Sequence, residues 1–345
     1  MNSKFCWRFI KSKYIIKKIF DILPTTKKLN IIQFNNNLKN ILNIDIEDYK
    51  KNGIIEIEIP SDNINGQFIS IKEEYSPFFH IYFDDNENET YKRYVYKSDK
   101  IHKIKIIIDH QVESLKGLFK NNDDLEKIEF TKCYRQTIID ISEMFFNCRY
   151  LKEVNLSKLR TNYVENMNSM FYGCKSLRKL DLSSFNTQNV KNMSHMFSEC
   201  ESLTELNVSN FNTSNLIYMT SMFEKCRSLQ KLNLSNFNTN KVIDMSSMFF
   251  GCEKLEELNL SNFNTSNVIN MGKMFRECSS LKQIEISSFD ISNTTDMSQM
   301  FAFCFSLTEL NFSNYKNNHI VLMDYSFYRC EKLKKINCSD ESKKH

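Results

Sequence analysis

The sequence predicts an α/β solenoid, in which similar short units stack and share one continuous core. The first observation is a cysteine that recurs every 26 residues, at Cys148, Cys174, Cys200, Cys226, Cys252, Cys278, Cys304 and Cys330. The second is a leucine three residues after each of them, with Leu125 marking an earlier unit in which Asn122 takes the cysteine position. We therefore expect nine units within residues 111–340, and a short tail over residues 341–345.

The chain ahead of the array divides into two regions. Residues 1–50 predict helices, because apolar side chains between Ile15 and Leu23 are three and four residues apart. Residues 51–110 predict a small β region, since isoleucines alternate with glutamates over residues 55–59. An open solenoid end exposes unpaired backbone groups and apolar surface. We expect this β region to cap the first strand of the array.

Each unit predicts two segments. Leu206 and Val208 alternate with polar residues, which predicts a short strand with one buried face. Over residues 216–226 apolar side chains recur at spacings of three and four, which predicts a helical or 3₁₀ turn capped by Thr213 or Ser214. Stacked units then place a parallel sheet on one face of the solenoid.

The repeated cysteines predict a buried, reduced core column. They lie on a Met-Met-Phe-Cys-Leu stripe, and free cysteine packs as a small hydrophobe. No Cys-x-x-Cys occurs and the six histidines are out of phase with the cysteines, so no zinc site is expected. The sequence has no Gly-rich phosphate loop and no Ser-His-Asp pattern. We expect no catalytic, cofactor-binding or metal-binding residue, and therefore a protein that is not an enzyme.

Charge and hydropathy constrain the partners. Residues 1–51 hold 11 Lys and Arg against four Asp and Glu, so the rest carries −3 of the total +4. A near-neutral array argues against nucleic acid as the ligand. No apolar run is long enough for a transmembrane helix, and the N-terminus lacks a signal-peptide pattern. These features favour a cytoplasmic protein, with the cell surface as the alternative.

The period and the motif Leu-x-x-Leu-x-Leu are typical of a leucine-rich repeat. The position that usually holds a ladder asparagine is here aromatic, so we expect an aromatic spine to replace the amide ladder at Phe185, Phe211, Phe237, Phe263 and Phe289. Units such as MSSMFFGCEKLEELNLSNFNTSNV resemble the BspA-like repeats of bacterial and protozoan surface proteins and mycoplasma lipoproteins. The resemblance rests on Met248, Phe249, Cys252, Leu255, Leu258, Leu260, Phe263 and Val268. It implies a solenoid used in protein binding or adhesion.

The outward face of the predicted sheet carries ordered polar columns. One column alternates in sign over six units, at Lys127, Glu153, Lys179, Glu205, Lys231 and Glu257. Opposite charges on neighbouring strands stabilise the register by roughly 0.2–1 kcal/mol per pair. The face therefore either serves as a solvated scaffold or binds a partner. We expect a protein–protein interaction scaffold whose partner-binding residues are Glu153, Asp181, Glu205, Asn207, Lys231, Asn233, Glu257, Asn259, Gln283, Glu285 and Glu309.

The N-terminal helical stretch offers an alternative function. It resembles an F-box, the module that docks an adaptor of a ubiquitin-ligase complex, at Ile15, Ile19, Phe20, Leu23, Pro24, Leu29 and Ile31. The resemblance implies a substrate receptor whose adaptor-binding residues are Ile15, Ile19, Phe20, Leu23 and Pro24. A helical cap packed on the β region explains the same pattern. A surface adhesin is the other alternative, so three functions remain open.

Overall fold

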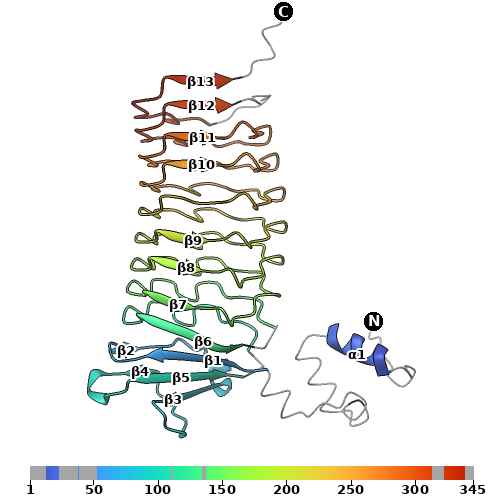
Figure 1. Ribbon diagram of the computed structural model, residues 1–345, viewed down its shortest axis with the longest axis vertical. Helices are drawn as coiled ribbons and strands as arrows, with labels where there is room; N and C mark the ends of the chain where they lie inside the picture. Colours follow the sequence, from blue (N-terminus) through green and yellow to red (C-terminus); the bar gives the residue numbers. More distant parts are fainter. Residues whose placement is uncertain are drawn as a thin grey trace, which may run out of the picture.

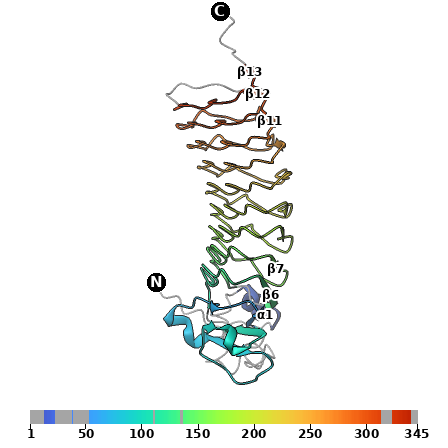
Figure 2. The same cartoon turned by 90° about the vertical axis from the view of Figure 1, so that its left-hand side faces the viewer.

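The computed structural model describes residues 13–22, 38, 53–109, 112–133, 137–312 and 322–338. The array is an elongated stack of coils whose labelled strands lie on a common face (Figure 1). Seen from the side, the coils follow one another in chain order (Figure 2). The expected tail over residues 341–345 lies outside the described residues. No helix in the described ranges is long and apolar enough to cross a membrane.

The strands of the array pair in parallel with a register of 26 residues. Leu180 lies opposite Leu206, Leu258 opposite Ile284 and Leu310 opposite Ile336. The predicted solenoid with a parallel sheet on one face is confirmed. The strands are β6 (Lys127–Cys133), β7 (Glu153–Asn155), β8 (Lys179–Asp181), β9 (Glu205–Asn207), β10 (Glu257–Asn259), β11 (Gln283–Glu285), β12 (Glu309–Phe312) and β13 (Lys335–Cys338).

The opposite side of each coil is built from turns, so the helical or 3₁₀ turn expected over residues 216–226 is wrong. The backbone N–H of Phe223 donates to Met248 O of the next coil at 2.9 Å, whereas a helix would keep this bond within the unit. A ladder of single parallel bridges, from Ser114 to Leu322, runs along this side. The spacings of three and four come from consecutive four-residue turns, which also return side chains to the core.

These turns place two residues per coil in the left-handed backbone region. In one coil they are Ser221 (φ 52°) and Lys225 (φ 54°), each the third residue of a turn closed by a backbone hydrogen bond. Such type II turns favour glycine at that position. Gly117, Gly173 and Gly251 occupy it in three coils, and a Cβ at Gly173 would collide with Asn147 Oδ1. In most coils a residue other than glycine occupies this position and adopts the strained left-handed backbone conformation.

A buried threonine links neighbouring coils at the five successive junctions that begin with Thr161 and end with Thr265. Thr213 Oγ1 donates to Asn238 O at 2.9 Å and accepts the Asn238 N–H at 2.7 Å. Thr213 is therefore an inter-coil bridge, and the expectation that it caps a helix is wrong. The same pair of bonds recurs at Thr161, Thr187, Thr239 and Thr265.

Two columns of phenylalanine fill the core. The first is a continuous stack in which neighbouring ring centroids are 5.2–6.0 Å apart, formed by Phe119, Phe145, Phe171, Phe197, Phe223, Phe249, Phe275, Phe301 and Phe327. The predicted column is also buried, and its Phe211 and Phe237 stack at 6.4 Å. It does not replace the amide ladder, however. Asn236 and Asn262, one residue earlier, donate to backbone carbonyls of the preceding coil.

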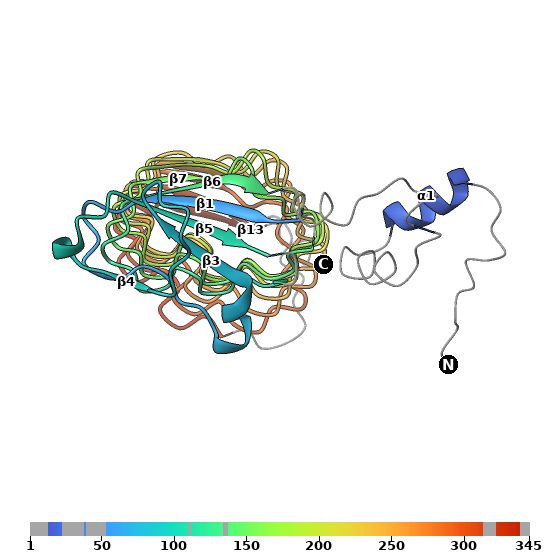
Figure 3. The same ribbon diagram turned by 90° about the horizontal axis from the view of Figure 1, so that it is seen from below.

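The N-terminal β region continues the sheet of the array. β1 (Ile55–Pro60) lies between β5 (Lys103–Ile108) and β6 and is antiparallel to both, and β3 (Phe79–Phe83) pairs with the outer side of β5. Seen from below, these strands lie across the end of the stack (Figure 3). The smaller elements are α1 (Lys13–Ile22), β2 (Gly66–Gln67), η2 (Glu73–Phe78), β4 (Tyr94–Val95) and η3 (Lys97–Asp99).

Candidate functional site

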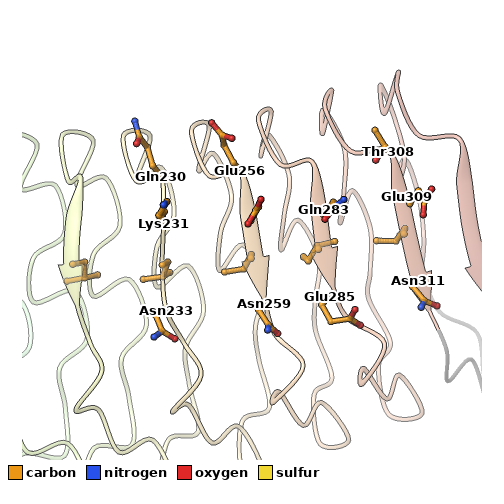
Figure 4. A pocket seen from close by; sticks show the side chains of 16 residues that line it. Gln230, Lys231, Asn233, Glu256, Asn259, Gln283, Glu285, Thr308, Glu309 and Asn311 are labelled. Atoms are coloured by element: carbon orange, nitrogen blue, oxygen red, sulfur yellow. The ribbon is translucent and has the colours of Figure 1, made fainter.

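A groove runs along the outer face of the strands. It consists of two hollows that share Leu206, Gln230 and Lys231. Figure 4 shows the same positions repeated from coil to coil along one of them. All eleven residues expected from the sequence line the groove. The part nearer the N-terminus contains Glu153, Asp181, Glu205 and Asn207, and the other part contains Lys231, Asn233, Glu257, Asn259, Gln283, Glu285 and Glu309.

Opposite charges of the alternating column form ion pairs between neighbouring coils. Lys127 Nζ lies 2.8 Å from Glu153 Oε2, and Lys179 Nζ lies 2.7 Å from Glu205 Oε1. The hydrogen bond with Glu153 raises the pKa of the Lys127 ammonium. These pairs are solvent-exposed, so they contribute little to the stability of the fold.

A second charged column lies beside the first, and sequence reasoning missed it. Lys152 Nζ is 2.8 Å from Glu126 Oε2, and Lys282 Nζ is 2.6 Å from Glu256 Oε2. The hydrogen bond from Lys282 lowers the pKa of the Glu256 carboxyl. In the sequence this column can be recognised because the charge changes sign between residues 26 apart, one position before the first column in each unit.

The column that begins at Asn155 has a local structural role. Asn207 Oδ1 accepts the backbone N–H of Ser209 at 3.1 Å, which closes the turn that follows the strand. Asp181 and Glu285 are the acidic members of this column, and each accepts the N–H of the serine two residues later. The bonds from that serine lower the pKa of both carboxyl groups. These side chains therefore reach the groove in fixed positions.

Apolar side chains at the strand centres also line the groove, between the polar columns. Leu206 and Leu232 are half-buried, while Leu258, Ile284 and Leu310 are buried. A partner lying in the groove would thus meet mainly charged and amide groups, with apolar contact at Leu206 and Leu232.

The thiols are part of the core and not of a site. Cys148 through Cys304 of the repeated column are buried and free, and Cys330 is half-buried, so the core interpretation is confirmed. Cys226 Sγ donates to Phe197 O at 3.1 Å, and burial raises the pKa of Cys200 to about 12. In the described ranges no group of three or more His, Cys, Asp and Glu is placed to hold a metal ion.

The N-terminal helix is described only in part. In α1, Ile15 exposes 48% of its area and Phe20 exposes 2%. The F-box interpretation expects Phe20 to be partly exposed, and the burial of its ring does not fit that expectation. The core cluster of the array and the β region does not include Phe20. Leu23, Pro24 and the side chain of Ile19 lie outside the described residues.

Comparison with known proteins gives one family match. The family described as "Mycoplasma protein of unknown function, DUF285" matches residues 113–233 and 219–339. A solved leucine-rich cell surface protein from Faecalibacterium prausnitzii A2-165 is similar at 16% identity, with 65% of this chain and 75% of that chain covered and a TM-score of 0.29. No curated protein matches. The family match spans the units that resembled mycoplasma-type repeats, and the chain belongs to the mycoplasma DUF285 family.

Proposed function

We propose that the chain is a non-enzymatic scaffold that binds a partner protein through the groove on its sheet face. The observation that carries this proposal is the continuity of the groove over successive coils, with exposed side chains in fixed columns. The charged and amide side chains of the groove are exposed, so they take no part in the core packing that holds the stack together. Sites on rigid strands position their contact groups well.

The proposal has two versions, which differ in where the protein acts in the cell. A cytoplasmic scaffold and a surface adhesin would both use the same groove. Labelling of intact cells with a membrane-impermeant amine reagent distinguishes them, because exposed lysines such as Lys158 and Lys254 would react only at the cell surface. The F-box version adds an adaptor contact at α1 and is tested separately below.

Site-specific photo-cross-linking tests the groove. A photoreactive phenylalanine at Gln230, which lines both hollows, should cross-link to a protein partner in extracts of the source cell. The matched control places the same group at Tyr218, which is exposed on the bridge ladder at the other side of the coil. Adducts that form at Gln230 and not at Tyr218 support the proposal. The same adducts from both positions, or from Tyr218 alone, would overturn it.

A further inference from the structure

A second exposed surface lies in the N-terminal β region, on β4 and the segments beside it (Figure 1). Tyr91, Tyr94 and Tyr96 expose 86%, 49% and 54% of their area. Val95 is buried, so the alternation of the strand turns Tyr94 and Tyr96 toward the same outer side. Tyrosine is enriched in protein interfaces, because its ring buries apolar area while its hydroxyl keeps a hydrogen-bond partner.

The same stretch carries uncompensated positive charge. The Arg93 guanidinium is engaged internally, donating to Ile71 O at 2.9 Å and to Ser76 Oγ at 2.7 Å. The Asp99 carboxylate is engaged as well, since it accepts the Tyr96 N–H at 3.0 Å. In the described part of the chain no ion pair involves the three exposed lysines of this stretch, Lys92, Lys97 and Lys100.

This positive patch lies within a region whose net charge is negative. Residues 53–109 contain seven Lys and Arg against eleven Asp and Glu, a net charge of −4. Within residues 91–100 the balance is four basic residues against one acidic residue. The preceding loop, Asp84 to Glu89, holds four carboxylates and would repel a long polyanion that crossed the patch. A short acidic segment fits the local charge better than nucleic acid does.

A small hollow adjoins the patch and gives it shape. Tyr96, Lys97 and Lys100 line it together with Asp62 and His102. His102 Nδ1 lies 2.6 Å from Asp62 Oδ1, so these two groups largely satisfy each other. The two lysines therefore set the charge of the hollow, which offers an acidic side chain a place beside the Tyr96 ring.

We propose that Tyr91, Tyr94, Tyr96, Lys92, Lys97 and Lys100 form a docking surface for a short acidic segment of a partner protein. The lysines attract and orient the carboxylates, and the tyrosine rings supply the apolar contact area. This surface is separate from the sheet-face groove. It functions whether or not the groove binds its own partner.

Peptide selection on the full chain tests this surface without knowledge of the natural partner. Random peptides displayed on phage are selected on the wild-type chain, and the enriched peptides are titrated by fluorescence anisotropy. We expect acidic peptides that contain aromatic or aliphatic residues. The triple variant Lys92→Glu, Lys97→Glu, Lys100→Glu should weaken their binding ~10-fold or more, since like charges would then oppose them. Tyr94→Ser with Tyr96→Ser should weaken it ~3-fold or more.

The control variant is Lys158→Glu, Lys254→Glu, Lys332→Glu, which changes the net charge equally at exposed positions of the array. It should bind the selected peptides as the wild type does, and thermal melting checks that all variants are folded. Peptides without acidic enrichment, equal losses in both triple variants, or tighter binding of a single-stranded oligonucleotide of equal charge would each overturn the proposal.

Discussion

At the residue scale, the side chains that enter the core are set by the turn geometry as well as by strand alternation. In the coil between β9 and β10, Leu234 exposes 1% of its area, whereas Leu232 is half-buried and faces the groove. The alternation of apolar residues alone assigns both to the core. Sequence reasoning could not separate them, because residues 231–234 form no regular strand in this coil and leave Leu232 partly open to the groove.

Truncation of Leu234 should reveal this difference. Leu234→Ala should lower the free energy of unfolding by about 2–5 kcal/mol, because it leaves a cavity in a close-packed core. Glu257→Ala, on the exposed column, should change it by no more than about 0.5 kcal/mol. Denaturant midpoints of the two variants decide the matter. Similar losses would contradict the assignment of inward and outward positions.

The thiol column predicts a loss of stability in alkaline solution. Burial raises the pKa of Cys148, Cys200 and Cys252 from 9.0 to about 12. Between pH 9 and 12 the unfolded chain therefore loses thiol protons that the folded chain keeps. Unfolding becomes more favourable with rising pH, by about 1.4 kcal/mol per pH unit for each such thiol.

Chemical denaturation between pH 8 and 10.5 measures this effect. Cys200→Ala is the matched variant, because it removes one titrating group from the middle of the column. The slope of its unfolding free energy against pH should be smaller than that of the wild type above pH 9. Equal slopes would mean that the Cys200 thiol already titrates in the folded state.

At the scale of elements, the sequence predicted the strands, their register and the outward columns, but it misassigned the opposite side of the coil. Spacings of three and four from Met219 to Cys226 fit a helix and a chain of type II turns equally well. The choice between them depends on inter-coil hydrogen bonds, which a single unit does not encode. The exposure of the groove residues could be predicted, because the alternation of side chains along a strand does not depend on the structure of the opposite side of the coil.

The element α1 offers a test of its two interpretations. Because Phe20 is buried, Phe20→Asp should place an unpaired charge in an apolar environment and destabilise its surroundings by several kcal/mol. Unfolding curves and co-purification with a ubiquitin-ligase adaptor are measured on this one variant. An unchanged unfolding curve together with loss of adaptor binding would instead support the F-box interpretation. Tyr150→Asp, at an exposed aromatic position of the array, is the matched control.

At the scale of the whole molecule, the two ends of the described array differ. β1 covers the first strand, β6, whereas β13 is paired only with β12 in the described part of the chain. The last coil exposes Leu322, Tyr325 and Ile336 by 54%, 69% and 43% of their areas. Repeat arrays are held by nearest-neighbour contacts, so a coil with one neighbour opens more readily than one with two.

Hydrogen exchange followed by mass spectrometry should therefore show a gradient. Amides of residues 322–338 should exchange fastest, and those of the central coils slowest. Ile57 is fully buried in the sheet at the other end, and Ile57→Asp should speed exchange of β6 before that of β9. Uniform protection along the wild-type array, or uniform acceleration in the variant, would show that the stack opens as one cooperative unit.

The inter-coil threonine bridge has a consequence for how such a chain can change its length. From Thr161 to Thr265, each coil presents to the next the same hydroxyl, the same carbonyl and the same ring that it receives from the one before. Within this stretch a whole 26-residue unit could thus be duplicated or deleted with each junction still matched, while an insertion of any other size would break the phase. The groove would then grow or shrink in fixed steps of about 4.8 Å, the spacing of neighbouring strands. The length of ligand that the groove can hold therefore depends on the number of repeat units. Unequal recombination could change that number without any change in core packing.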